Sequence, residues 1–254
     1  SERLKQAIAL AKSNIEKFHF SQKEEIVKVE TSPGVVCWRE ARPIEKVGIY
    51  VPGGTAPLFS TVLMLAIPAK IAGCKEIVLC SPPGKEGAIH PAILYAANLA
   101  GVTRIFAVGG IQAIGAMSFG TKSVPKVEKI FGPGNQYVMT AKHAAQYYGT
   151  AIDMPAGPSE LLVVADETCR PSFVAADLLS QAEHGPDSEV ILLSDNKKVV
   201  KEINKELDIQ LANLPRKEMA EKALKNSRAI LFKDVETCIR FSNVYAPEHL
   251  ILAV

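Results

Sequence analysis

A short apolar run ends in a glycine turn at Val47-Gly48-Ile49-Tyr50-Val51-Pro52-Gly53-Gly54. The run is rich in β-branched residues, which favours a strand, and it has no alternation of polar and apolar positions. A strand without alternation is typical of a parallel sheet that is covered on both faces. A helix-length segment follows the turn, so the stretch predicts a strand, a tight turn and a covering helix.

The same alternation of strand and helix continues along the chain, which indicates parallel sheets. Apolar residues at helical spacing predict an N-terminal helix over residues 1–20. We therefore predict an α/β fold with two doubly wound, Rossmann-like parallel-sheet domains and an N-terminal helix. The first domain covers residues 43–153, and the second covers residues 154–254 together with residues 1–42. The further predicted strands are Glu76–Cys80, Arg104–Val108, Lys129–Phe131, Leu161–Ala165, Glu189–Leu193 and Ala229–Phe232, with a hairpin-like segment at Val35–Arg39.

The composition argues against several classes of protein. The 254 residues are 48% hydrophobic and 22% charged, with a formal net charge of +2, which is ordinary for a globular protein. Basic residues form no stripe, so nucleic acid is not an expected partner. No apolar run is long enough to cross a bilayer, so no membrane partner is expected either. The five cysteines are odd in number and have no metal-type spacing, which fits free thiols in the cytoplasm.

Two further strands of the first block are also followed by glycine-rich turns. They read Val108-Gly109-Gly110-Ile111-Gln112 and Phe131-Gly132-Pro133-Gly134-Asn135. Glycine permits close approach of the backbone, and the N-terminus of the following helix offers free N–H groups to an anion. None of the turns is a G-x-G-x-x-G, and for any one of them alone packing is the favoured explanation. Three in one block favour an edge that binds a nucleotide or phosphate.

Gln181 and His184 stand three residues apart near the end of a predicted helix, Pro171–His184, with Gly185 at its C′ position. This spacing puts both side chains on one face, where both can reach one metal ion. Two ligands do not hold a catalytic zinc, which usually has three protein ligands. The alternative is a histidine that interacts with the helix dipole.

Glu248 and His249 stand side by side just before the apolar run Ile251–Val254. A histidine that titrates near neutrality beside a carboxylate suits proton transfer. The alternative is a surface ion pair with a solvated imidazole, and the pair taken alone favours this alternative.

Taken together, these segments resemble the histidinol dehydrogenase family in their order and spacing over nearly the whole chain. The resemblance also includes Ala156-Gly157-Pro158-Ser159-Glu160. It implies two successive NAD-dependent oxidations of L-histidinol to L-histidine, through an aldehyde that stays in the site. It further implies a zinc ion that orients the substrate, and a homodimer whose active sites include residues of the partner chain.

The resemblance also implies roles for single residues. Gln181 and His184 match two zinc ligands that also contact the substrate, and Ser159 matches a substrate-contacting serine. Glu248 and His249 match the catalytic pair, and His249 also contacts the substrate. The positions that match contacts to NAD are Tyr50, Gln112 and Asn135.

The family extends further at both ends. Its segment beyond Val254 supplies an aspartate and a histidine to zinc and a glutamate to the substrate, and none of these is present here. We therefore expect an incomplete zinc site, weak zinc binding, impaired turnover and uncertain dimerisation for this chain.

Two other functions stay open at this stage. A two-domain protein that only binds a small ligand would tolerate substitution of Glu248 and His249. An aldehyde dehydrogenase with a cysteine nucleophile would lose its activity on thiol alkylation.

Overall fold

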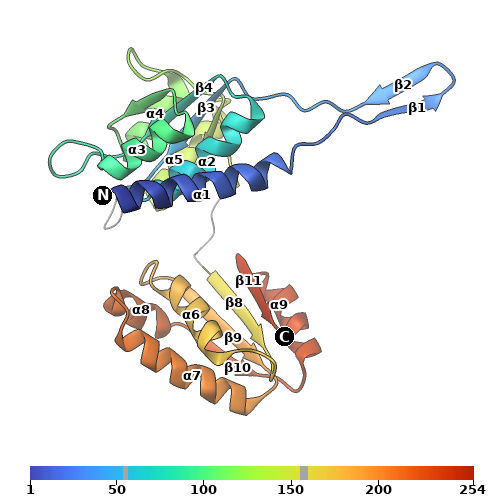
Figure 1. The fold of residues 1–254 in the computed structure, drawn as a ribbon, viewed down its shortest axis with the longest axis vertical. Helices are drawn as coiled ribbons and strands as arrows, with labels where there is room; N and C mark the ends of the chain where they lie inside the picture. The colour runs from blue at the N-terminus through green and yellow to red at the C-terminus, as the bar shows by residue number, and fades with distance from the viewer. Residues whose placement is uncertain (54–56, 155–159) are drawn as a thin grey trace. The chain divides into compact units, whose positions relative to one another are not determined.

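The chain folds into two α/β units that follow one another in the sequence. A computed structural model describes residues 1–53, 57–154 and 160–254. The units are Ser1–Ala156 and Gly157–Val254 (Figure 1). Each has a parallel sheet with helices on both faces, so the predicted fold class is confirmed.

The sheet of the first unit has the strand order β5-β4-β3-β6-β7, and all neighbours are parallel. The chain runs outward from β3 to β4 and β5 and then returns to the other side of β3 to form β6. The direction of winding therefore reverses between β3 and β6. The strands are β3 (Lys46–Tyr50), β4 (Glu76–Cys80), β5 (Arg104–Phe106), β6 (Lys129–Phe131) and β7 (Ala151–Ile152).

Helices cover this sheet in two layers. Helices α1, α2 and α3 share one buried apolar cluster with side chains of β3 and β4, and α4 and α5 share another with β3, β4 and β6. Alternate residues of each strand point into the two clusters, as expected for a sheet with two covered faces. The helices are α1 (Glu2–Phe20), α2 (Phe59–Ala72), α3 (Pro91–Ala100), α4 (Gly110–Phe119) and α5 (Gln136–Tyr147).

Helix α1 packs within the first unit, so the predicted grouping of residues 1–42 with the second domain is wrong. Its residue Ile8 is 1% exposed and lies in the cluster of α2 and α3. The reason is the composition of α2, which carries apolar residues around its whole circumference. A helix of that kind needs cover on the side away from the sheet, and the apolar stripe of α1 supplies it.

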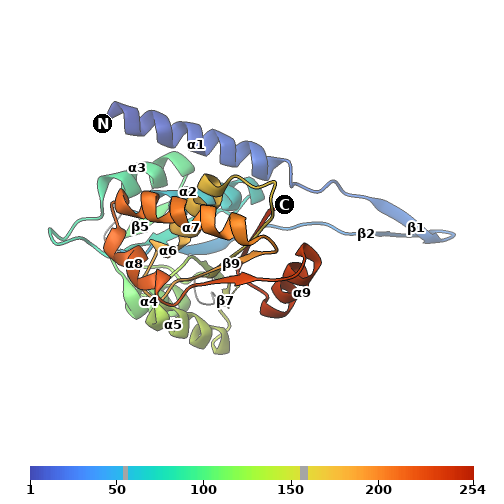
Figure 2. The same cartoon turned by 90° about the horizontal axis from the view of Figure 1, so that it is seen from below.

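A two-stranded hairpin projects from the first unit after α1 (Figure 2). Strands β1 (Lys28–Ser32) and β2 (Val35–Trp38) pair antiparallel, and every strand residue is exposed. The predicted hairpin-like segment Val35–Arg39 corresponds to β2.

The sheet of the second unit has the order β10-β9-β8-β11, again with all neighbours parallel. Helices α6, α7 and α8 cover one face, and α9 covers the other. The strands are β8 (Glu160–Ala165), β9 (Glu189–Ser194), β10 (Arg228–Leu231) and β11 (His249–Ala253), and the helices are α6 (Pro171–Ala182), α7 (Lys197–Ala212), α8 (Lys217–Leu224) and α9 (Val235–Tyr245).

The predicted strands agree with the structure to within two residues at each end. No helix within residues 1–53, 57–154 and 160–254 is both long and apolar enough to cross a membrane.

Candidate active site

The glycine turns of the first unit lie at the carboxyl edge of its sheet, after β3, β5 and β6 (Figure 1). Ligands of open α/β sheets bind at this edge, beside the point where the winding reverses. Here that point lies between Tyr50, which ends β3, and Gly132, which follows β6. Gly54 lies outside the described residues.

Tyr50 joins the end of β3 to the start of α4. Its ring is buried, and its hydroxyl accepts a hydrogen bond of 3.0 Å from the N–H of Gly110. Helix α4 has no side-chain cap, so the Tyr50 hydroxyl supplies an acceptor that its first turn otherwise lacks. The side chain of Gln112 folds back over Gly110. Its Oε1 lies 2.9 Å from the position that a Cβ on Gly110 would take. Two of the predicted cofactor contacts therefore meet at Gly110.

Gly132 brings the third turn against the same strand end. Its φ is +124°, and a Cβ added to it would lie 2.1 Å from the carbonyl oxygen of Tyr50. Asn135 stands three residues further on, exposed at the start of α5, where its Oδ1 accepts a hydrogen bond of 3.1 Å from the N–H of Val138. The turns after β3 and β6 are thus in contact, and Asn135 belongs to the second of them.

The second unit has its candidate residues at the opposite edge of its own sheet. Helix α6 returns from the end of β8 to the start of β9, so its C-terminus lies at the amino edge of the strands. The helix ends at Ala182 rather than at the predicted His184, and Gly185 does not cap it, because Glu183 is the C-cap residue in a right-handed conformation. Gln181 is buried at the end of the helix. His184 follows in a turn, where its N–H donates a hydrogen bond of 3.1 Å to the carbonyl oxygen of Gln181.

The ring of His184 suits a metal ligand. Its Nδ1 lies 2.7 Å from the carbonyl oxygen of Ser180, so this nitrogen carries the proton. The lone pair of Nε2 is then free for a metal, which is the arrangement that orients metal-binding histidines in general. Gln181 offers an amide oxygen three residues earlier. Within the described residues, no group of three or more His, Cys, Asp or Glu side chains is placed to hold a metal ion.

His249 is the first residue of β11 and pairs with Leu161 at the start of β8. Ile251 and Ala253 of the same strand pack into the apolar cluster that contains α6. Because side chains alternate along a strand, His249 points to that same face of the sheet. His249 and the end of α6 therefore share both an edge and a face. Glu248 lies with its Oε1 3.9 Å from Nε2 of His249, which is an ion-pair distance rather than a hydrogen bond.

Comparison with known proteins shows the family to which the chain belongs. A profile of the histidinol dehydrogenase family matches residues 1–254. Histidinol dehydrogenase from Bacteroides thetaiotaomicron is 63% identical over 252 residues, which are 99% of this chain and 59% of that protein. The crystal structure of histidinol dehydrogenase from Elizabethkingia anophelis aligns with a TM-score of 0.97 at 63% identity, over 100% of this chain and 59% of that one. The chain belongs to the histidinol dehydrogenase family.

The chain spans 59% of the length of these two histidinol dehydrogenases. A propionaldehyde dehydrogenase from Clostridium phytofermentans aligns with a TM-score of 0.55 at 13% identity, over 100% of this chain and 82% of that one. At that identity the likeness concerns the fold alone.

The cysteines lack the features of a nucleophile. Cys80 ends β4 near the glycine turns, but burial raises the pKa of its thiol to about 12, so it stays protonated near neutral pH. Burial also raises the pKa values of Cys74, Cys169 and Cys238. Cys37 is exposed on the hairpin.

The amino edge of the second sheet also gathers carboxylates that the motifs did not single out. Glu160 and Glu189 begin neighbouring strands and are paired in register. Burial raises the pKa of the Tyr245 hydroxyl to about 12, and the carboxylates of Glu160 and Glu189 add to the effect. The available signal was a glutamate just before the predicted strand Leu161–Ala165 and another at the first position of the predicted strand Glu189–Leu193. Side-chain alternation places both glutamates on the α9 face of the sheet, opposite the face that holds His249 and the end of α6.

Two residues remain, of which Ser159 is a predicted substrate contact and Asp177 was assigned no role by the sequence. Asp177 lies one turn before Gln181 on α6, and burial raises the pKa of its carboxyl group. Ser159 lies outside the described residues.

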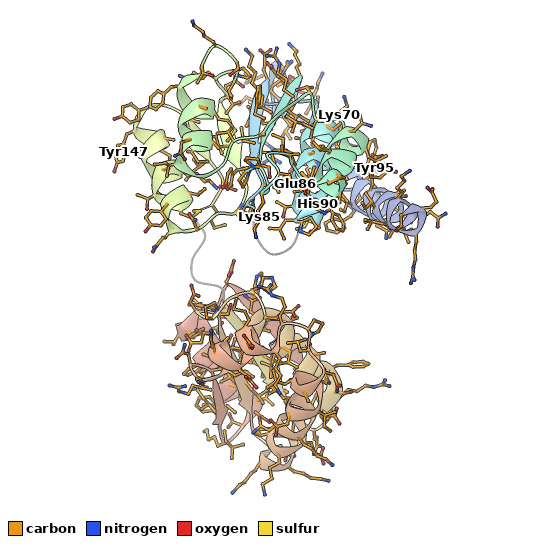
Figure 3. All side chains as sticks on the ribbon, turned by 90° about the vertical axis from the view of Figure 1, so that its left-hand side faces the viewer. Lys70, Lys85, Glu86, His90, Tyr95 and Tyr147 are labelled. Atoms are coloured by element: carbon orange, nitrogen blue, oxygen red, sulfur yellow. The ribbon has the colours of Figure 1, made fainter. Side chains whose placement is uncertain are left out.

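Two other histidines have structural contacts. His90 starts α3 (Figure 3), where its Nδ1 accepts a hydrogen bond of 3.1 Å from the N–H of Ala92. His19 has its Nδ1 2.7 Å from Oε1 of Gln22 on the surface of the first unit.

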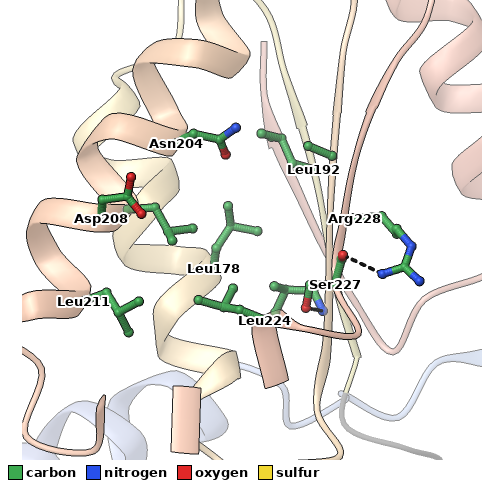
Figure 4. A pocket seen from close by; sticks show the side chains of 11 residues that line it. Leu178, Leu192, Asn204, Asp208, Leu211, Leu224, Ser227 and Arg228 are labelled. Carbon is green, nitrogen blue, oxygen red and sulfur yellow. Dashed lines mark hydrogen bonds between the residues drawn. The ribbon is translucent and has the colours of Figure 1, made fainter. Parts of the chain in front are cut away.

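A pocket of about 290 Å³ opens elsewhere in the second unit, between α6, α7 and the edge strand β10 (Figure 4). Leucines of α6, α7 and α8 form its wall, and Asp208 and Arg228 belong to its polar rim. Gln181, His184, Glu248 and His249 do not line it, so this pocket is separate from the candidate site.

Proposed function

We propose that this chain carries the cofactor-binding turns and the acid–base pair of an enzyme that oxidises L-histidinol to L-histidine with NAD, the last step of histidine biosynthesis. The observation that carries the proposal is the position of His249, at the first residue of β11 beside Glu248, on the sheet face that also holds the end of α6. Membership of the family supports the same reaction.

In the first oxidation a hydroxyl proton has to leave as the alcohol carbon loses its hydride. His249 accepts that proton at a ring nitrogen, because a neutral imidazole is the side chain best matched to proton transfer near pH 7. Its side chain is 57% exposed, so substrate can reach it. The product of this step is the aldehyde.

In the second oxidation the aldehyde gains an oxygen. Glu248 accepts a proton from the water that adds to the aldehyde carbon, and His249 accepts the hydroxyl proton of the resulting hydrate. Loss of a second hydride then leaves the carboxylic acid. Neither proton transfer needs a thiolate, in keeping with the raised pKa of Cys80.

When bound, NAD would supply the hydride acceptor, one NAD molecule for each of the two oxidations, and zinc would hold and orient the substrate. Tyr50, Gln112 and Asn135 surround the reversal point of the first sheet and are the residues that we assign to NAD. His184 and Gln181 are the donors that we assign to zinc, and Ser159 remains assigned to the substrate. The Ser180 carbonyl holds the His184 ring with Nε2 free, which fits this role.

Gln181 and His184 are fewer donors than the three that a catalytic zinc site usually has. We therefore expect this chain to bind zinc weakly and to turn over more slowly than its longer relatives. A homodimer in the cytoplasm is the assembly and compartment that we propose. The five free cysteines fit a reducing compartment.

Calorimetry with L-histidinol tests the substrate assignment. L-Histidinol should bind more tightly with added zinc, and a chelator should abolish the gain. The variant His184→Asn should lose the zinc-dependent part, whereas His19→Asn in the first unit serves as the matched control and should keep it. Equal affinity with and without zinc in the unaltered chain would refute the metal and substrate assignments.

A further inference from the structure

Lys142 is the one charged side chain buried to 1% exposure among the residues that the structure describes. It lies on α5, in the layer that packs against β3 and β6. Burial of a charge is unfavourable unless the charge is paired and hydrogen-bonded. The sequence analysis assigned no role to this residue, and the reaction proposed above does not use it.

Two charged side chains hold the peptide groups of one glycine. The Nζ of Lys142 donates a hydrogen bond of 2.7 Å to the carbonyl oxygen of Gly132 and also contacts Oδ1 of Asp153. The other carboxylate oxygen of Asp153, Oδ2, accepts a hydrogen bond of 2.7 Å from the N–H of Gly132. Both polar groups of Gly132 are therefore bound by a lysine–aspartate pair.

The pair acts where the sheet ends. The ladder between β6 and β7 stops at Ile130 and Ile152, and β6 pairs with β3 only as far as Phe131. Gly132 is the next residue, and its positive φ carries the chain over the carbonyl of Tyr50. At the reversal point of the first sheet, the side chains of Lys142 and Asp153 therefore bind backbone groups that strand pairing no longer binds.

A buried ion pair is weak support for stability, because well-packed apolar residues often stabilise a fold equally well. The geometric effect of this pair is specific, since it orients the peptide planes that lead into Pro133-Gly134-Asn135 and the start of α5. We propose that Lys142 and Asp153 are positioning residues, which hold the Gly132 turn in the orientation that receives NAD. The inference rests on the proposed function, because NAD is the ligand named.

The test uses the full chain and the variants Lys142→Met, Asp153→Asn and the double variant. NAD affinity is measured by calorimetry, thermal unfolding by circular dichroism, and the ordering of residues 132–135 by hydrogen exchange. We expect Lys142→Met to weaken NAD binding about tenfold or more, because small displacements of positioning groups have large effects. Lys70→Met, at an exposed lysine of α2 (Figure 3), is the matched control and should leave NAD affinity unchanged.

The double variant separates positioning from stability. It removes the partly buried Asp153 charge that Lys142→Met leaves without its partner, so its melting temperature should recover. If the pair positions the turn, NAD affinity stays weak and exchange at residues 132–135 stays fast. Recovery of NAD affinity together with the melting temperature would overturn the inference, as would a folded Lys142→Met variant with unchanged affinity. Absence of NAD binding by the unaltered chain would overturn the proposed function and the ligand named here. Exchange at residues 132–135 would then still decide whether the pair holds the turn.

Discussion

At the scale of single residues, two histidines differ in ways that assign them different chemistry. His184 has one ring nitrogen fixed by a backbone carbonyl, which leaves the other nitrogen for a metal. His249 is exposed beside Glu248, with neither nitrogen committed to a backbone group in the hydrogen bonds of the described residues. A proton acceptor needs that freedom, and a metal ligand needs the fixed tautomer.

Replacement of His249 by asparagine tests the first role. We expect the rate of NADH formation to fall about 10²- to 10⁴-fold, which is the usual contribution of a general base. NAD affinity should not change, because the residues assigned to NAD lie in the other unit. Steady-state kinetics and calorimetry provide the two readings, and His19→Asn is the control. A rate within a factor of about three of the unaltered chain would remove His249 from the mechanism.

Asp177 gives a prediction for the dependence of stability on pH. Burial raises the pKa of its carboxyl group in the folded chain, so folding disfavours its charged form. This destabilising effect is absent below the ordinary aspartate pKa of about 3.9. It grows as the pH rises from there to the raised pKa of the folded chain, and it is fully present above that pKa. Asp177→Asn should therefore be more stable than the unaltered chain at pH 7, and the difference should vanish near pH 3.

Urea unfolding at the two pH values measures the difference in the free energy of unfolding. Asp208→Asn, at an exposed position on α7 of the same unit, reports the effect of net charge alone. A stabilisation by Asp177→Asn that is the same at both pH values would contradict the burial argument.

At the scale of elements, the strands were predictable because buried parallel strands are continuous apolar runs that end at glycine or polar turns. Strand β7 was missed because its two residues are too few to form a pattern. The end of α6 was predicted two residues late, because Gly185 suits a C′ position by sequence, whereas the helix already ends at Ala182 with Glu183 as its C-cap residue. There the His184 N–H bonds to the Gln181 carbonyl, three residues earlier.

Two glycines of neighbouring elements give an element-scale prediction. A Cβ at Gly132 would meet the Tyr50 carbonyl oxygen at 2.1 Å, whereas a Cβ at Gly115 within α4 meets nothing within 4 Å. We expect Gly132→Ala to lower the free energy of unfolding by about 2 kcal/mol or more, because it adds a clash to an unfavourable φ. Gly115→Ala should raise it by about 0.5–1 kcal/mol, since alanine is the better helix former.

Denaturant unfolding of the two variants provides the comparison. Equal effects of the two substitutions would mean that the turn after β6 adjusts freely, contrary to the contact with Tyr50.

At the scale of the whole molecule, the sequence patterns located the residues but not their surroundings. The three-residue spacing predicted that Gln181 lies near His184, and Glu248 is next to His249 in the sequence. No sequence pattern predicted how these two pairs lie relative to each other. That relation needed the register of β11 against β8 and the return of α6 to the amino edge of the sheet. The sequence patterns also could not predict which elements α1 packs against. An apolar stripe indicates that one face of a helix is buried, but it does not indicate which elements cover that face. Lys142 and Asp153 are eleven residues apart and belong to no recognised motif, so their contact could be found only from the structure.

The proposed function has two parts, namely that turns of the first unit bind NAD and that His249 and Glu248 accept the protons released in the oxidation of L-histidinol. The most direct test follows NADH absorbance after the chain is mixed with L-histidinol, NAD and zinc, with and without a chelator. The account predicts slow NADH formation that requires L-histidinol, yields two NADH for each L-histidine formed and stops on chelation. Absence of NADH at saturating substrates and zinc would contradict the claim, and so would one NADH for each substrate consumed.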